Sequence, residues 1–175
     1  MSGIGDQVYQ QITNSNDLFR KLLSKIPGFK GYVEMGNRKD ADKVIRDMLF
    51  RRFRELEGKV SDLQVQLINQ GDINNADDLE KAALRLRTFA DRMRTAPRGY
   101  SSVFEAVKIK EPELVKLYQY DLALLDKTDE VGRAIDNIQS SVGTDGLPAS
   151  IRNLQTVAKE CVQAYDLRQE AIIGQ

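Results

Sequence analysis

Apolar residues recur every three or four positions along most of the chain, which is the spacing of one buried face of an α-helix. The longest such run predicts a helix from Asn37 to Gln70. Its apolar stripe consists of Ile45, Leu49, Phe53, Leu56, Val60, Leu63 and Leu67. At about 1.5 Å per residue this helix would measure roughly 50 Å, so we expect it to be the spine against which the other helices pack.

The same spacing predicts four further helices. The first covers residues 8–26 and stops before Pro27, because the residue preceding a proline is disfavoured in the α region. The third follows Gly71 and begins at Asn74 or Asn75 as its N-cap. Its apolar stripe is Leu79, Ala82, Leu86, Phe89, Ala90 and Met93. The short turn before it predicts an antiparallel hairpin with the long helix.

The last two helices are separated by a glycine-rich turn. The fourth runs from Pro112 to Val142, and the fifth is opened by Pro148 after Gly143 and Gly146. With no credible strand pattern and no repeat of 20 to 50 residues, the fold class predicted is all-α, an antiparallel helical bundle of about five helices with one long central helix. We expect residues 1–175 to form a single domain.

The amino-acid composition excludes several kinds of catalytic and metal-binding sites. The chain has 41% hydrophobic and 30% charged residues, typical of a soluble protein rich in surface helices. It has no histidine and one cysteine, which excludes histidine-based triads, the usual zinc sites and an internal disulfide. We therefore predict no enzyme, and no catalytic, metal-binding or cofactor-binding residues. No apolar run reaches transmembrane length and no signal-like segment opens the sequence, so a cytoplasmic location is expected.

Two polar residues and the single cysteine lie on the apolar stripes of their helices. Asp121 and Thr128 lie on that of the fourth helix. A carboxylate facing a core usually pairs with an arginine or reaches the end of a bundle, whereas a catalytic acid would need a second convergent group that the sequence does not identify. Cys161 lies on the stripe of the fifth helix and is predicted to be a small buried hydrophobe; a reactive thiol would need an electropositive, accessible setting.

Charge is balanced overall and uneven along the chain. Residues 1–110 hold 20 basic and 15 acidic residues, whereas residues 111–175 hold 6 and 11, giving +5 and −5. On the long helix, charges alternate in sign at four-residue steps through Lys43, Asp47, Arg51, Glu55 and Lys59, and again through Arg38, Asp42 and Arg46. We interpret this pattern as a solvated salt-bridge ladder, with a polyanion surface or a protein interface as alternatives.

The third helix is the least balanced. Its cations Lys81, Arg85, Arg92, Arg94 and Arg98 have few acidic neighbours at helical spacing. We expect them to pair with the acidic C-terminal half. The alternative is that they bind a polyanion, either nucleic acid or anionic lipid.

Two connectors carry aromatic rings beside glycines, at residues 26–32 and 99–104. Their rings are Phe29, Tyr32, Tyr100 and Phe104. They could cap the bundle as a hydrophobic plug or bind a protein partner, since loops on rigid scaffolds often carry function. These four residues are the candidate interaction residues.

Several phrases resemble those of uncharacterised bacterial helical proteins. They are IPGFKGY at 26–32, RKDADKVIR at 38–46, GYSSVF at 99–104 and YQYD at 118–121. The resemblance implies a bacterial, cytosolic, all-helical protein and carries no activity or site residue with it. We therefore predict a non-enzymatic helical interaction or scaffold module, with stripes like those of coiled coils, that mediates protein–protein contacts or self-association. No small-molecule substrate, cofactor or transmembrane segment is predicted.

Overall fold

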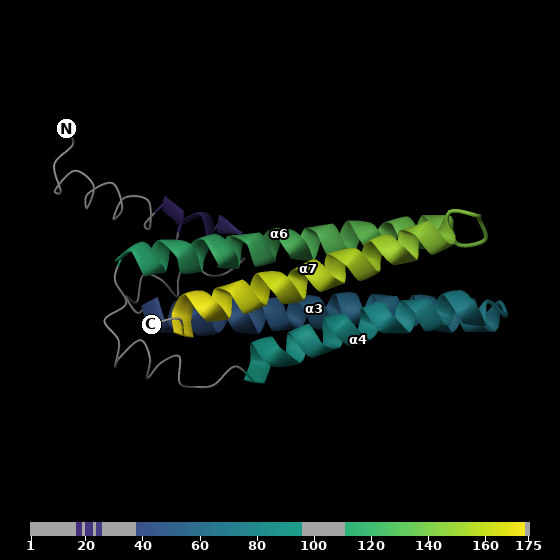
Figure 1. The fold of residues 1–175 in the computed structure, drawn as a ribbon, viewed down its shortest axis with the longest axis horizontal. Coiled ribbons are helices and arrows are strands. Elements are labelled where there is room, and N and C mark those ends of the chain that lie inside the picture. Colours follow the sequence, from purple (N-terminus) through teal and green to yellow (C-terminus); the bar gives the residue numbers. More distant parts are fainter. Residues whose placement is uncertain (1–16, 19, 23, 26–37, 96–110, 174–175) are drawn as a thin grey trace. The chain divides into compact units, whose positions relative to one another are not determined.

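The computed structural model describes residues 17–18, 20–22, 24–25, 38–95 and 111–173. The long helices within these ranges are α3 (Arg38–Asn69), α4 (Ile73–Thr95), α6 (Glu111–Ser141) and α7 (Leu147–Ile173) (Figure 1). Six residues between 17 and 24 are also helical, and the rest of the predicted first helix lies outside the described ranges. The prediction of an all-α helical bundle is confirmed. The long helix that was predicted is present as α3, with 32 residues, but it is not unique, since α6 has 31.

Contacts along the chain divide it into two compact units. The four-helix unit comprises residues 46–96 and 124–164, and the second unit comprises residues 1–45, 97–123 and 165–175. Helices α3, α6 and α7 each contribute one segment to each unit, whereas described residues of α4 belong only to the four-helix unit. The single domain expected from the sequence stays a prediction.

The core of the four-helix unit is built from the predicted stripes. Every predicted apolar position of α3 is buried, from Ile45 at the boundary to Leu67, and so is every one of α4 from Leu79 to Met93. Phe53 of α3 and Phe89 of α4 meet edge to face, with ring centroids 4.4 Å apart. Such aromatic pairs stabilise by about 1 kcal/mol beyond the area they bury.

The turn between α3 and α4 explains the tight hairpin. Gly71 adopts φ 81°, a left-handed conformation that favours glycine. Its N–H donates to the Ile68 carbonyl, and the Asp72 N–H donates to the Leu67 carbonyl, which is the Schellman pattern of a helix end. Asp72 then caps α4, because its Oδ1 accepts the Asn75 N–H over 3.4 Å. The predicted N-cap at Asn74 or Asn75 is therefore wrong, since the Schellman turn brings Asp72 directly into the cap position.

The turn between α6 and α7 is longer and spans residues 142–146. Gly143 adopts φ 77°, and the Ser141 and Ser150 hydroxyls meet at 2.9 Å across the turn. Helices α6 and α7 begin at Glu111 and Leu147, each one residue before the position predicted from its proline. Proline lacks a backbone N–H, and the N–H groups in the first turn of a helix have no carbonyl partner within that helix. A proline at the second helical position therefore fits as well as one at the first.

Within the four-helix unit each hairpin is antiparallel and the neighbours between hairpins are parallel. Arg52 contacts Thr128, and Gln66 contacts Gln139, so residue numbers rise together along α3 and α6. Helices α4 and α7 meet where the Gln155 side chain donates to the Asp78 carbonyl over 2.8 Å. Figure 1 shows the same directions for the two hairpins.

The second unit contains a buried ion pair. Asp121 of α6 and Arg168 of α7 are 1% and 0% exposed. The Arg168 Nε–H donates to Asp121 Oδ1 over 2.6 Å. The prediction that the core-facing Asp121 pairs with an arginine is confirmed.

Candidate functional site

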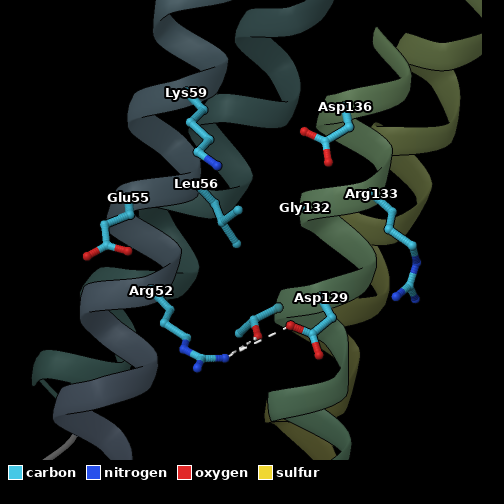
Figure 2. A pocket seen from close by; sticks show the side chains of 9 residues that line it. Arg52, Glu55, Leu56, Lys59, Asp129, Gly132, Arg133 and Asp136 are labelled. Atoms are coloured by element: carbon cyan, nitrogen blue, oxygen red, sulfur yellow. Dashed lines mark hydrogen bonds and ion pairs between the residues drawn. The ribbon is translucent and has the colours of Figure 1, made fainter. Parts of the chain in front are cut away.

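A groove of about 400 Å³ lies between α3 and α6 in the four-helix unit. Figure 2 shows the residues that line it, with Leu56 and Lys59 directed from α3 toward α6. Its lining consists of Arg52, Glu55, Leu56, Lys59, Thr128, Asp129, Gly132, Arg133 and Asp136. The floor is narrow where Gly132 faces Leu56: a Cβ added at this glycine would meet Leu56 Cδ2 at 3.9 Å.

Charges in the groove alternate between the two helices. Arg52 lies 4.0 Å from Asp129 and donates to the Thr128 hydroxyl over 3.3 Å. Seven residues further along each helix, Lys59 and Asp136 face one another in Figure 2, and no ion pair joins these two described residues. The Thr128 O–H donates to the Leu125 carbonyl over 2.6 Å, so it offers no free hydroxyl for attack on a substrate. The groove is a mixed-charge surface with balanced signs.

The salt-bridge ladder predicted on the long helix is not formed between Asp47 and Lys59, and its other steps involve side chains outside the described residues. Arg51, Glu55 and Lys59 make no ion pair with one another in this part of α3. Within this part of α3, Arg54 instead pairs with Glu57 at 3.1 Å. Exposed pairs four residues apart contribute only a few tenths of a kcal/mol, so they compete poorly with contacts between helices.

Glu57 of α3 is a buried carboxylate with several hydrogen-bond and ion-pair partners. It is 6% exposed, and it accepts the Arg87 Nη2 of α4 at 2.7 Å and the Ser61 hydroxyl at 3.3 Å. The hydrogen bond and the charge of Glu57 raise the pKa of the Arg87 guanidinium. Together with Arg54, this cluster links α3 to α4 on the outer side of their hairpin.

The predicted polyanion-binding residues do not converge on one site. Lys81 pairs with Asp78 of its own helix at 2.6 Å, and Arg85 donates to the Gln155 carbonyl of α7 over 3.1 Å. The Arg94 guanidinium lies 5.7 Å from the centroid of the Phe50 ring, a cation–π contact. Arg92 is exposed. Arg98 lies outside the described residues.

The expected pairing of these cations with the acidic C-terminal half is wrong for Lys81 and Arg85. Lys81 uses an acid of α4 itself, and Arg85 uses a neutral carbonyl. Charge sums over halves of a chain do not fix contacts, because each pair depends on which side chains two packed helices bring within reach. The aromatic candidates Phe29, Tyr32, Tyr100 and Phe104 lie outside the described residues, so their role stays a prediction.

A different surface stands out on the α3–α4 hairpin. Among the described residues, four of the five large apolar side chains that are at least half exposed belong to it: Val65, Ile68, Ile73 and Leu84, at 51–57%. On α4, Ile73, Asp77, Glu80 and Leu84 are separated by four, three and four residues and therefore share one side of the helix. Val65 and Ile68, three residues apart, share one side of α3.

A side-chain bridge joins these two stripes. The Gln64 amide, next to Val65 in α3, donates to Glu80 Oε2 at 2.8 Å and to the Ala76 carbonyl at 3.2 Å. The stripe of α4 that carries Glu80 and Leu84 therefore lies beside the side of α3 that carries Gln64 and, one turn further on, Ile68. We call this surface the outer hairpin face, made of Val65, Ile68, Ile73, Asp77, Glu80 and Leu84.

The sequence contained a signal for this face. Val65, Ile68 and Leu84 are large apolar residues that lie off the stripes of their own helices. An apolar residue outside the buried stripe must either meet another helix or remain exposed, so such positions deserve inspection before the fold is known. The stripes predict the core, whereas these off-stripe residues are the signal for the outer hairpin face that sequence reasoning missed.

A third polar cluster surrounds Cys161, which is buried as predicted. Lys127 of α6 reaches Glu130 at 2.7 Å and Glu160 of α7 at 2.5 Å. Burial acts to lower the pKa of Lys127, and the hydrogen bonds to Glu130 and Glu160 outweigh it, so this pKa is raised. Burial raises the pKa of the Cys161 thiol to about 12, which keeps it protonated.

No group of three or more cysteine, aspartate or glutamate side chains in the described ranges is placed to hold a metal ion. Of the helices in those ranges, none is long and apolar enough to cross a membrane.

Comparison of the chain with protein-family models, with curated proteins and with solved structures gave no match. The resemblance to uncharacterised bacterial helical proteins therefore stays a prediction.

Proposed function

We propose that this chain is a non-enzymatic helical interaction module that binds another protein, or a second copy of itself, through the outer hairpin face. The observation that carries the proposal is the exposure of Val65, Ile68, Ile73 and Leu84 at 51–57% on one hairpin. Single exposed apolar residues are common on soluble proteins, whereas several grouped on one surface are typical of an interface. Covering each half-exposed side chain would contribute about 1 kcal/mol.

The packing beneath this face supports its role as a docking surface. In the same segments of the two helices, Leu63, Leu67, Leu79 and Ala83 are buried, and the hydrogen bond from Gln64 to Glu80 joins the helices within the face. A surface held by a packed core and by cross-helix hydrogen bonds changes little on binding, so little conformational entropy is lost when a partner docks.

The test is the apparent mass of the tagged chain in a native extract, measured by size-exclusion chromatography. We expect the chain to elute in an assembly larger than its own 19.8 kDa. Leu84→Gln should shift it toward that mass, because it places an amide in the apolar contact. Leu167→Gln is the matched control, since Leu167 is 50% exposed and lies in the second unit. Elution of the unsubstituted chain at 19.8 kDa, or an unchanged profile for Leu84→Gln, would contradict the proposal.

Polyanion binding by α4 is the alternative function. Lys81, Arg85 and Arg94 already have contacts within the chain, so the geometry gives this alternative less support. It predicts binding of an oligonucleotide or of anionic vesicles that weakens steeply with salt and with charge reversal at Arg85 and Arg92. Lack of binding at low salt would eliminate it. A cytoplasmic location remains part of both proposals.

A further inference from the structure

We propose that the occupant of the outer hairpin face is a basic amphipathic helix of a partner protein. This inference rests on the proposed function and adds the chemistry of the partner. It combines the apolar residues of the face with the sign of the charges among them, and each can be tested separately.

The charges on and around the face are almost all negative. Residues 61–84 hold five carboxylates and one cation. That cation, Lys81, is already paired with Asp78 at 2.6 Å. On the face itself, Asp77 is exposed and makes no ion pair within the described chain, and Glu80 accepts only the neutral Gln64 amide. Docking an acidic helix here would place like charges together, whereas a basic helix would meet complementary ones.

The face also has a defined basic end. Beyond Leu84 the next residue of the same stripe is Arg87, whose guanidinium is bound to Glu57, and Arg54 is bound to the same carboxylate. The two guanidinium groups share one carboxylate, so this end of the hairpin keeps one net positive charge. The negative charge among the apolar residues is that of Asp77 and Glu80, of which Glu80 also acts electrostatically on Arg87.

The arrangement of the exposed apolar residues indicates that the partner binds as a helix. They line two helices that lie side by side, and such a pair presents a shallow trough into which an amphipathic helix can lay its apolar side. Leucine or isoleucine at every third or fourth position would contact Val65, Ile68 and Leu84. Lysine or arginine flanking that stripe would reach Asp77 and Glu80.

The experiment is a titration of the full chain with a labelled synthetic peptide, followed by fluorescence anisotropy. The peptide has about 18 residues, enough to form a helix, with a leucine stripe flanked by lysines and alanine elsewhere. One control peptide replaces the lysines by glutamates, and a second keeps the composition but scrambles the stripe. We expect the lysine peptide to bind at least about tenfold more tightly than either control, with affinity falling as salt rises.

Variants of the chain separate the two parts of the inference. Leu84→Gln and Ile68→Gln should weaken the lysine peptide by about tenfold, and Asp77→Asn with Glu80→Gln should weaken it by a similar factor and flatten its salt dependence. Leu167→Gln and Asp145→Asn, an exposed carboxylate in the α6–α7 turn, are the controls and should leave binding unchanged. All these positions are exposed or carry exposed carboxylates, so each variant should fold.

The possible results distinguish this inference from the proposed function. Equal binding of the lysine and glutamate peptides, or an unchanged affinity in the Asp77→Asn, Glu80→Gln chain, would overturn the basic partner. If no peptide binds and light scattering shows an oligomer that Leu84→Gln dissociates, the occupant is a second copy: the basic helix is overturned and the proposed function stands. If no peptide binds and Leu84→Gln changes no assembly, both are overturned.

Discussion

Arg168 donates its Nε–H to Asp121 Oδ1 over 2.6 Å, with both side chains almost completely buried. Breaking such a pair leaves one buried charge without its partner, whereas replacing both residues by apolar ones removes the cost of burying either. Asp121→Ala should therefore lower the free energy of unfolding by about 3–5 kcal/mol. Urea denaturation followed by circular dichroism measures this change.

The double variant Asp121→Leu with Arg168→Met serves as the comparison. It should recover most of the stability that Asp121→Ala loses, because no charge is left in the core. A loss below about 1 kcal/mol for Asp121→Ala would show that this ion pair does not hold the second unit together.

Glu57 is the second buried acid with a defined role. Its carboxylate accepts from Arg87 and Ser61 and pairs with Arg54. Removing it by Glu57→Ala should cost about 1.5–3 kcal/mol, the range for hydrogen bonds to a charged group. Glu55→Ala is a close control on the same helix, since Glu55 is exposed, and it should change stability by less than about 0.5 kcal/mol. Equal effects of the two substitutions would contradict the assignment of Glu57 as the link between α3 and α4.

Burial of Cys161 predicts both its reactivity and a dependence of stability on pH. The buried thiol should not react with a thiol reagent at pH 8 and should react fully in denaturant. Folding raises its pKa from 9.0 to about 12, so between these values the unfolded chain binds fewer protons than the native one. Stability from this group is present below pH 9 and falls as pH rises, by at most about 1.4 kcal/mol per pH unit.

Cys161→Ala provides the reference for this dependence. Its unfolding free energy should fall less steeply with pH above 9 than that of the unsubstituted chain, measured by urea titrations at several pH values. Parallel pH profiles for the two proteins, or rapid labelling of the native thiol at pH 8, would show that the thiol is accessible to water.

Two glycines of the α3–α4 hairpin should respond in opposite ways to alanine. Gly71 has φ 81°, so Gly71→Ala strains the backbone and should destabilise by about 1 kcal/mol. Gly58 lies within α3, and a Cβ there would meet no atom within 4 Å. Gly58→Ala should therefore stabilise by up to about 1 kcal/mol through helix propensity. Thermal melts compare the two variants, and a change of the same sign in both would refute the explanation.

Periodicity and helix-end chemistry made most of the fold predictable. The positions of Leu49, Phe53 and Leu86 followed from three- and four-residue spacing, and the helix end at Gly71 from its backbone freedom. The pairing of Asp121 with an arginine was also predictable, because a buried carboxylate needs a cation. Each of these depends on neighbours along one helix or on one strong physical requirement.

The candidate site was less predictable, because it depends on which helices lie side by side. The link between Glu57 and Arg87 joins residues 30 positions apart, and periodicity within one helix cannot reveal it. The predicted salt-bridge ladder is not formed between Asp47 and Lys59 for the related reason that a repeat of charges does not specify contacts. The outer hairpin face could have been suspected from Val65 and Leu84, but only the packed hairpin brings their stripes together.

The most direct test of the docking surface is photo-crosslinking from a benzoylphenylalanine placed at position 84, compared with one at position 167. Leu84 and Leu167 are 54% and 50% exposed, so chance contacts should be similar at both. We expect a discrete adduct with one protein or with a second copy at position 84, and none at 167. Equal labelling at the two positions, or no adduct at 84, would contradict the claim that the outer hairpin face is the interface.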